Sequence, residues 1–394
     1  MRRQIMPPIV IAYCALLVGC GDPESASQGT VTVRDSLGTR IVEHDEPPES
    51  PAISLDLVWE HGHAPGDYEF QFVLLGALDS DGGAVVGDML NQEVVAIASS
   101  GTDHLILARS GQGPTEVRRP RAIEAAGDHS FWVEDTGNAK LMLYEGSELV
   151  RSVSTQGNAT VTRGMMPLGV DANGSLLMRT ASYSTNFEQL WLDGSLTRFD
   201  PDAGTLDTVG TYPMTPKVPD TGVNPFTAYG VVTGAAGGFV HGRADVAELT
   251  WRSADGVIAQ IVRWSPNVRY PTSEFWALFE ARQRADLTRM NPGMSGDRID
   301  DMVARYDVDE SIPLPLFGPI YGADDGSVWL SEFVPRGTYA TSYEILSAEG
   351  EWVGVADFAR AFLVLDIRGQ FVLGMVMDES DVQGLAVYRF EVGS

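Results

Sequence analysis

The feature that most constrains this fold is an internal repeat of just under 50 residues. Residues 62–68 (GHAPGDY) and residues 111–117 (GQGPTEV) share the pattern Gly-x-small-Pro-x-acid-apolar and begin 49 positions apart. A repeat of this length indicates a supersecondary unit that buries its apolar face by stacking against its neighbours. A second set of residues recurs 47 positions apart, with Val85, Val86, Asp88 and Asn91 aligned to Trp132, Val133, Asp135 and Asn138.

The repeated unit is predicted to contain four antiparallel strands. A turn followed by a short apolar strand recurs at residues 81–86, 128–133, 173–177, 237–240, 325–330 and 368–373. Asp-Gly and Asn-Gly between apolar runs are typical of hairpin turns, because a positive φ costs little at these residues. A second turn follows each of the first five copies, and an entering strand precedes each copy. Four strands per unit predict the blade of a β-propeller.

The two ends of the chain are predicted to share one blade. The sixth unit, residues 362–392, contains only three strands, whereas Leu55, Leu57 and Trp59 alternate just before Gly62. That early strand stands in the fourth position of a blade, so its pairing with the last unit would close the ring and remove both open edges. The sequence therefore predicts an all-β fold over residues 53–394. It is a six-bladed β-propeller of four-stranded blades, with about 50 residues per blade outside one insertion.

The insertion, about residues 272–310, interrupts the β pattern between the fourth and fifth blades. Residues recur there at helical spacing on both sides of the breaker at residues 291–293 (NPG), which predicts two short amphipathic helices. The helices would form either a lid over one face of the ring or a decoration packed on its rim. The residues at helical spacing are Phe275, Leu278, Phe279 and Arg282, then Ile299, Met302, Val303 and Tyr306.

The N-terminus is predicted to be a lipoprotein signal peptide over residues 1–19. Arg2 and Arg3 precede an apolar run that is too short to span a bilayer. Residues 17–20 (LVGC) resemble the lipobox of bacterial lipoproteins, which implies cleavage before Cys20 and diacylation of its sulfur. Gly21 then favours the outer membrane if the host is a diderm bacterium. Residues 20–52 are expected to be the lipidated N-terminus and a tether; the alternative is a signal anchor or a chance cysteine.

The composition excludes some partners and leaves others open. There are 54 acidic and 27 basic residues, and the net charge of −27 argues against a nucleic-acid partner. Two cysteines cannot make a disulfide framework, and Cys14 would leave with the signal peptide. The expected partners are the membrane, through the lipidated N-terminus, and an unknown envelope protein, glycan or small ligand.

A weak metal signature lies in the first copy of the repeat. His61 and His63 are two residues apart, so in an extended segment they would face one side and, with Asp67, could bind Zn²⁺ or Ni²⁺. The second copy has Gln112 and Glu116 in place of His63 and Asp67, which favours a structural role in the loop. We therefore expect no cofactor, with a divalent cation as the remaining possibility.

Residues 111–117 (GQGPTEV) and the repeat pattern resemble the bacterial six-bladed β-propeller lipoproteins, a family related to NHL-repeat propellers. Most members of that family have no known activity, so the resemblance implies architecture more than function. Some six-bladed propellers, such as gluconolactonase-like hydrolases, use Glu, Asn and Asp around a divalent ion in the central funnel. The recurrence of the Asp88/Asn91 and Asp135/Asn138 pairs could reflect such a site, but structural turn residues recur in the same way.

The sequence therefore favours a lipid-anchored propeller of the cell envelope that acts as a non-catalytic scaffold for a ligand or a protein. The alternative is a metal-dependent hydrolase or lactonase with its site in the propeller funnel. No Gly-x-Ser-x-Gly, His-Glu-x-x-His or Gly-x-x-x-x-Gly-Lys motif is present, so no residue is predicted to be catalytic.

Overall fold

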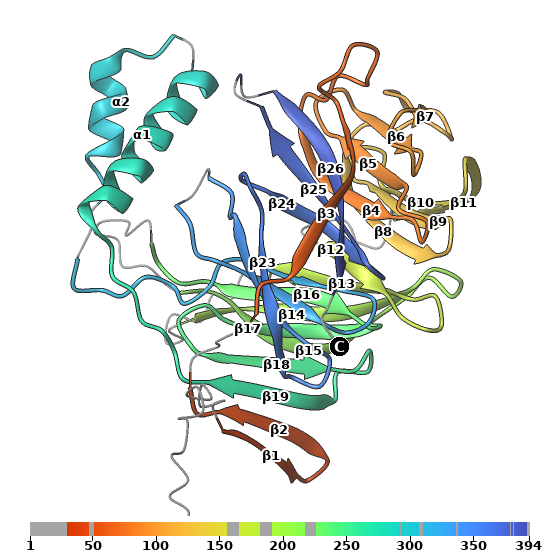
Figure 1. Cartoon of the computed structure of the whole chain (residues 1–394). Helices are drawn as coiled ribbons and strands as arrows, with labels where there is room; N and C mark the ends of the chain where they lie inside the picture. Colours follow the sequence, from red (N-terminus) through yellow and green to blue (C-terminus); the bar gives the residue numbers. More distant parts are fainter. Residues whose placement is uncertain are drawn as a thin grey trace, which may run out of the picture.

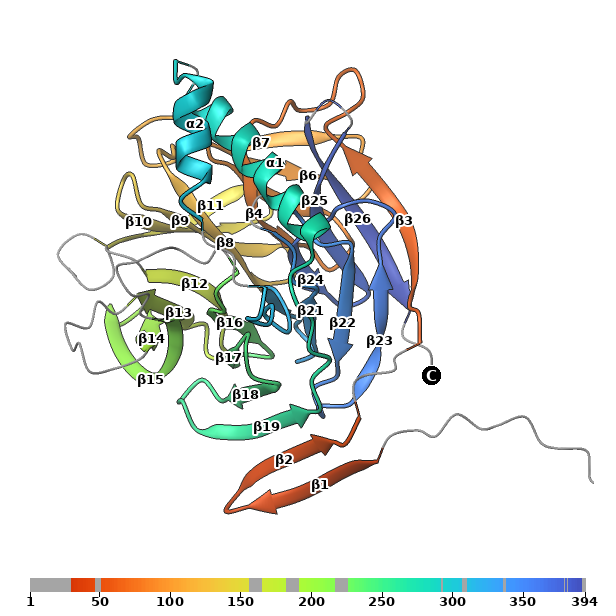
Figure 2. The same ribbon diagram turned by 90° about the vertical axis from the view of Figure 1, so that its left-hand side faces the viewer.

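The turns of the repeat organise the chain into antiparallel sheets that surround a common axis (Figures 1 and 2). The structure is a computed structural model, and it describes residues 30–46, 51–155, 165–181, 191–216, 226–291, 293–306, 310–335, 338–378, 380 and 382–391. Within these residues there are six sheets, five of four strands and one of six. This is the predicted six-bladed β-propeller with four-stranded blades.

Each blade is an antiparallel meander whose first strand lies nearest the axis, except that the last blade takes its outer strand from the N-terminal part of the chain. The first three blades contain β4 (Val73–Leu78), β5 (Ala84–Asp88), β6 (Glu93–Ile97) and β7 (His104–Ala108); β8 (Pro120–Gly127), β9 (Ser130–Asp135), β10 (Lys140–Glu145) and β11 (Glu148–Ser154); and β12 (Met165–Val170), β13 (Leu176–Ala181), β14 (Trp191–Asp200) and β15 (Thr205–Pro216). The last three contain β16 (Gly230–Ala235), β17 (Gly238–Arg243), β18 (Glu248–Arg252) and β19 (Ile258–Trp264); β20 (Ile320–Gly322), β21 (Val328–Ser331), β22 (Ser342–Leu346) and β23 (Trp352–Asp357); and β24 (Leu363–Arg368), β25 (Phe371–Met377), β26 (Gln383–Glu391) and β3 (Ser54–His61).

The predicted closure of the ring is confirmed. Strand β3 pairs antiparallel with β26, and Trp59 lies opposite Val387. Trp59 is only 4% exposed, and its indole Nε1–H donates a hydrogen bond of 2.9 Å to the carbonyl oxygen of Gly82 in the first blade. The closing strand therefore completes the sixth blade and also ties it to the first.

Apolar side chains fill the space between neighbouring blades. Six clusters of buried residues each draw on two adjacent blades, so every junction of the ring has its own small core. The cluster between the last and first blades combines Trp59, Val86 and Leu373, and the cluster between the fifth and sixth blades includes Trp329 and Phe362. Close packing of this kind explains why one unit alone would leave its apolar face exposed.

The N-terminal segment differs from the tether expected through residue 52. Strands β1 (Val31–Ser36) and β2 (Thr39–His44) form a hairpin, and β2 pairs in parallel with β19, which extends the fourth blade to six strands. Val42 is fully buried against Val262 and other residues of the core between the fourth and fifth blades. The hairpin turns at Leu37-Gly38, and Ile41 and Val42, which follow the turn, are the buried apolar residues that attach it to the propeller. The predicted signal peptide, residues 1–19, and Cys20 lie outside the described residues.

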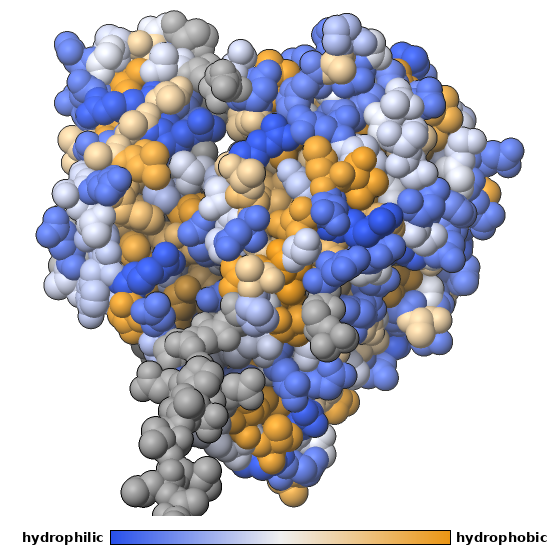
Figure 3. Space-filling view, in the orientation of Figure 1, coloured by the Kyte–Doolittle hydropathy of each residue, from blue (hydrophilic) through white to orange (hydrophobic). Residues whose placement is uncertain are grey.

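The two predicted helices are present in the insertion as α1 (Ser273–Met290) and α2 (Gly296–Val303). Thr272 caps α1 by accepting a hydrogen bond from the backbone N–H of Phe275. Phe279 is 1% exposed and packs edge-on against Phe226, which also contacts Phe333 of the fifth blade. Figures 1 and 2 place the two helices on one face of the ring. Figure 3 shows hydrophilic residues spread over the visible surface of both the helices and the blades. No helix in the described part of the chain is long and apolar enough to cross a membrane.

We predict that Trp59→Ala destabilises the ring by about 3–5 kcal/mol, because it removes a buried indole and opens a cavity at the closing junction. Chemical denaturation, monitored by the far-UV circular dichroism of the backbone, measures this loss of stability. Leu57→Ala is the matched control, since Leu57 lies on the same strand but is 53% exposed, and its expected effect is below about 0.5 kcal/mol. Equal effects for the two variants would show that β3 does not close the ring through Trp59.

Candidate functional site

The innermost strands enclose a channel whose two ends differ. Strands β4, β8, β12, β16, β20 and β24 each contact the next around the ring, and β24 contacts β4 again. At one end, which we call the tight-turn face, each inner strand enters a hairpin to the second strand of its own blade. The other end carries the connections between blades, including the helical insertion. Short turns leave the tight-turn end of the channel open to small molecules.

A cavity of about 370 Å³ lies at the tight-turn end of the channel. Its wall is formed by the last residues of β8, β12, β16, β20 and β24 and by the turns that follow them. Much of the wall is Gly and Ala, and the packing allows little else. A Cβ atom on Gly322 would lie 1.9 Å from the carbonyl oxygen of Gly234, and one on Gly234 would lie 2.0 Å from that of Leu168. The polar side chains in the wall are Glu124, Asp171, Asp324, Asp366 and Arg368.

Glu124 is the least constrained carboxylate in this wall. It projects from β8, is half-buried, and has no hydrogen bond to another described residue. Its surroundings in the channel remove much of its hydration. This desolvation raises the pKa of Glu124 to about 8, and the negative charges of Asp366 and Glu134 add to the effect. Glu124 is therefore largely protonated at neutral pH.

Asp366 is held more firmly than Glu124. Its two carboxylate oxygens accept hydrogen bonds from the backbone N–H groups of Leu78, at 2.7 Å, and Ile367, at 2.9 Å. Desolvation raises the pKa of Asp366 to about 6, although these hydrogen bonds and the charge of Arg368 oppose the rise. Since Leu78 belongs to β4, Asp366 also links the sixth blade to the first.

Two further acidic groups near the channel have unsatisfied oxygens. Asp171 lines the cavity and is 6% exposed; its Oδ1 accepts the N–H groups of Asn173 and Ser175, whereas its Oδ2 has no partner among the described residues. Glu134, on β9 opposite Ala122 of β8, is 5% exposed, and its Oε2 likewise has no described partner. Burial raises the pKa of Glu134 to about 7, although the charge of Arg121 opposes the rise. A buried carboxylate oxygen without a partner is costly, so Asp171 and Glu134 each lower the stability of the fold.

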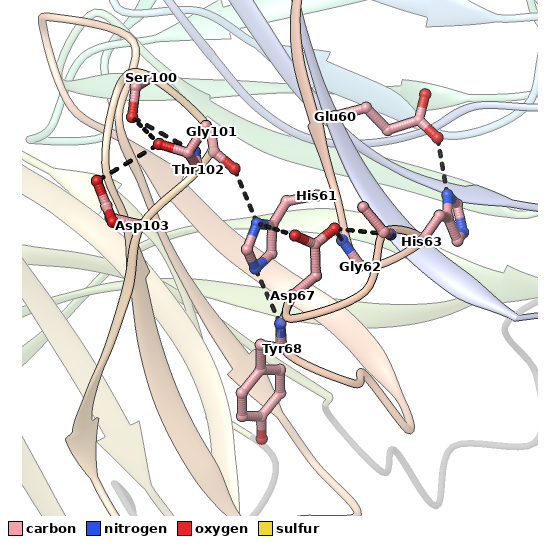
Figure 4. A network of polar contacts seen from close by, with 11 residues as sticks. Glu60, His61, Gly62, His63, Asp67, Tyr68, Ser100, Gly101, Thr102 and Asp103 are labelled. Carbon is pink, nitrogen blue, oxygen red and sulfur yellow. Dashed lines mark hydrogen bonds and ion pairs between the residues drawn. The ribbon is translucent and has the colours of Figure 1, made fainter.

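Of the three residues of the predicted metal signature, His61 and Asp67 lie together, with Nδ1 of His61 3.5 Å from Oδ1 of Asp67, whereas His63 points away (Figure 4). Strand β3 ends at His61 and Gly62 has a φ of +111°, so the chain turns and the two imidazoles point apart (Figure 4). His61 is fully buried, with Nδ1 2.8 Å from the carbonyl oxygen of Gly101 and Nε2 accepting the N–H of Tyr68. The expectation that both rings would face one side was therefore wrong.

His63 and Asp67 serve the loop instead. His63 contacts Glu60 through Nδ1, at 2.7 Å, and the carbonyl oxygen of Val382 through Nε2, at 3.1 Å. Asp67 accepts hydrogen bonds from the backbone N–H groups of Gly62 and Ala64 (Figure 4). In the second copy, Glu116 accepts the N–H of Gly113 in the same way. Over the described residues, no group of three or more His, Cys, Asp or Glu side chains is arranged to hold a metal ion.

The recurring Asp and Asn residues also hold loops. Asp88 is fully buried and accepts the backbone N–H groups of Gln71 and Phe72, which precede β4, together with those of Leu90 and Asn91 in its own turn. Asp135 repeats these contacts in the second blade, with Arg118, Arg119, Gly137 and Asn138 as donors. The carboxylate thus fixes the connection between blades to the end of the second strand. These contacts support the interpretation of the four residues as structural.

The sequence did not identify the acidic residues of the cavity. Glu124 stands in the run Ala122–Ala126 and Asp366 in the run Leu363–Ile367, each as the one charged residue of an otherwise apolar segment. An isolated acid within an apolar strand was the available signal. An isolated acid of this kind points to the channel only if its strand is the innermost of the blade. The repeat pattern alone gives no reason to single out those strands.

Comparison with known proteins adds no functional assignment. No protein-family profile matches the chain, and no curated protein matches it. Solved structures with some similarity include a putative exported protein from Bacteroides fragilis, which is 11% identical, with 89% of this chain and 99% of that chain covered and a TM-score of 0.49. Virginiamycin B lyase from Staphylococcus aureus is 7% identical, with coverage of 86% and 99% and a TM-score of 0.43. A calcium-binding protein, regucalcin, from Agrobacterium tumefaciens is 9% identical, with coverage of 87% and 96% and a TM-score of 0.41.

The raised pKa of Glu124 predicts a specific pH dependence of stability. Between about pH 4.5 and pH 8 the folded chain keeps a proton on Glu124 that the unfolded chain releases, so the free energy of unfolding falls as the pH rises through this window. Glu124→Gln should flatten that fall and be more stable than the wild type at pH 8, by about 1–2 kcal/mol, a figure reduced because the channel admits water.

Denaturation curves at half-unit pH steps measure the difference between the two proteins. Asp366 and Glu134 contribute slopes of the same sign in both proteins, and because their charges act on Glu124, the difference also contains any change in their own titration. Asp103→Asn, an exposed acid in a turn on the tight-turn face, is the control and should follow the wild type. Parallel curves for wild type and Glu124→Gln would mean that Glu124 titrates normally.

Proposed function

We propose that this chain is a lipid-anchored propeller of the cell envelope that acts as a non-catalytic binding scaffold, with its ligand held in the central cavity. The observation that carries the proposal is the cavity at the tight-turn face, which gathers polar side chains from four blades around the axis. Its volume of about 370 Å³ lies within the range of small-molecule sites. Among the expected partners, a cavity of this size favours a small ligand over a protein or a long glycan.

The cell-envelope location rests on the N-terminal sequence. Removal of residues 1–19 would take away two arginines and no acidic residue, so the mature net charge would be −29. Diacylation at Cys20 would supply enough acyl chain for stable attachment, and Gly21 favours the outer membrane in a diderm host. Nine residues lie between Cys20 and Thr30, so the two are at most about 35 Å apart. An anionic propeller on a linker of this length would be repelled from an anionic membrane surface.

The alternative function is a metal-dependent hydrolase or lactonase with its site in the funnel. It would need a divalent ion held by several oxygen or nitrogen ligands and a substrate bound beside it. Hydrolysis of a lactone or ester that depends on an added divalent ion, and that is lost when the cavity is blocked, would favour this alternative over the scaffold.

The first prediction of the scaffold proposal concerns the mouth of the cavity. Ala172→Trp places an indole at the cavity wall, on an exposed turn position where the larger side chain can be accommodated without disturbing the core. Native mass spectrometry of the protein purified from its source organism should detect a bound small molecule in the wild type and at least tenfold lower occupancy in Ala172→Trp. Asn173→Trp, the next residue of the same exposed turn but outside the cavity wall, should retain the ligand. Equal occupancy in all three proteins would contradict a site in the cavity.

The second prediction concerns the anchor. Cells that express the wild-type chain should incorporate radiolabelled palmitate into it, whereas Cys20→Ala should incorporate none, because the mature chain has no other cysteine. Absence of label in the wild type would rule out lipidation.

A further inference from the structure

We propose that the cavity binds an organic ammonium ion, with Glu124 as the carboxylate that receives it. This inference rests on the proposed binding function and names the class of its ligand. Four carboxylates face or adjoin the cavity, and only one cationic side chain, Arg368, lies in its wall. Arg368 is itself paired with Asp128, at 3.4 Å. The wall therefore offers an excess of negative groups to an incoming cation.

Only some of the acidic groups at the cavity have their oxygens occupied by hydrogen bonds that hold the fold together. Asp366 and Asp324 accept hydrogen bonds from the backbone N–H groups of Leu78 and Gly369, respectively, and these hydrogen bonds link neighbouring blades. Glu124 makes no hydrogen bond to a described residue, and Asp171 is more than nine-tenths buried at the wall with one oxygen unpartnered. Unsatisfied acceptors at a cavity wall call for a donor that the protein does not provide. An ammonium group supplies N–H donors together with the charge that these acceptors lack.

The size of the cavity points to an organic cation rather than a single ion. The carboxylates come from β8, from the turn after β12, from the turn after β20 and from β24, so they are distributed around the wall. A volume of about 370 Å³ is roughly ten times the space that one water molecule occupies in the liquid. Between the acids, the wall presents Ala125, Ala126 and Ala235, whose methyl groups suit the carbon chain of an alkylamine. A short alkyl diamine fits both the size and the distribution of charge.

Binding should release a proton. At neutral pH Glu124 carries a proton, since desolvation raises its pKa to about 8. An ammonium ion that enters beside it favours the carboxylate, so the proton passes from Glu124 to the buffer as the ion pair forms. The groups that act on Glu124 from the surrounding elements are Asp366, Glu134, Asp171, Asp324, Arg368 and, through Glu134, Arg121. Affinity should therefore increase between pH 6 and pH 8.

Isothermal titration of the purified mature chain with 1,5-diaminopentane tests the inference, with the neutral 1,5-pentanediol as a matched probe. The diamine should bind and the diol should not. Glu124→Gln should raise the Kd for the diamine at least tenfold, whereas Asp103→Asn, which replaces an exposed carboxylate by an amide, should leave it unchanged. Titration in two buffers of different ionisation enthalpy at pH 7 should show proton release in the wild type and less release in Glu124→Gln.

The possible outcomes separate this inference from the broader proposal. If neither the diamine nor a series of alkyl mono- and triamines binds the wild type, the ammonium inference is overturned, whether or not native mass spectrometry finds another bound molecule. A bound molecule that is neutral or anionic and is lost in Ala172→Trp would retain the scaffold and reject the ammonium ligand. Diamine binding that is equally weakened in Glu124→Gln and Asp103→Asn would show attraction to the overall negative charge, which also overturns the inference.

Discussion

The pairing of β3 with β26 is the interaction on which the rest of the ring depends. It joins residues more than 300 positions apart in the chain, and it converts an open row of blades into a closed ring in which the last blade packs against the first. Trp59 makes this pairing more than a set of backbone hydrogen bonds, because its indole belongs to the core between the last and first blades. Every other junction joins blades that are consecutive in sequence and gains from that proximity, whereas this one must offset a long loop closure.

The connections between blades are held by a chemistry that the repeat encodes. In the first two blades a buried aspartate at the end of the second strand gathers the N–H groups of the preceding connection, which would otherwise be left unsatisfied near the core. The carboxylate recurs in both copies of the repeat for that structural reason. The same logic applies to Asp67 and Glu116, which cap their own loops. Recurrence of acidic and amide residues in a propeller therefore has a structural explanation before a catalytic one.

The sequence predicts those parts of the fold that depend on local signals. Hairpin turns require particular residues, as at Gly82 and Gly326, which have positive φ, and strand alternation identifies the apolar faces. The β1–β2 hairpin was missed because its partner β19 lies more than 200 residues away and no local signal specifies a parallel pairing. Glu124 and Asp366 were missed for a related reason. Each looks like a single polar residue in a strand, and only the closed ring brings the two together.

The charges at the end of the channel follow from this closure as well. Asp366 accepts the N–H of Leu78 across the junction between the sixth and first blades, so one of the cavity acids helps to seal the ring that creates the cavity. Desolvation raises the pKa of both Asp366 and Glu124, which means that the folded chain tolerates these carboxylates at a cost to its stability. A structural role accounts for Asp366, because its hydrogen bonds offset part of the desolvation cost of the carboxylate. Glu124 has no such hydrogen bond to a described residue, and the ammonium ligand that we propose would supply the missing partner.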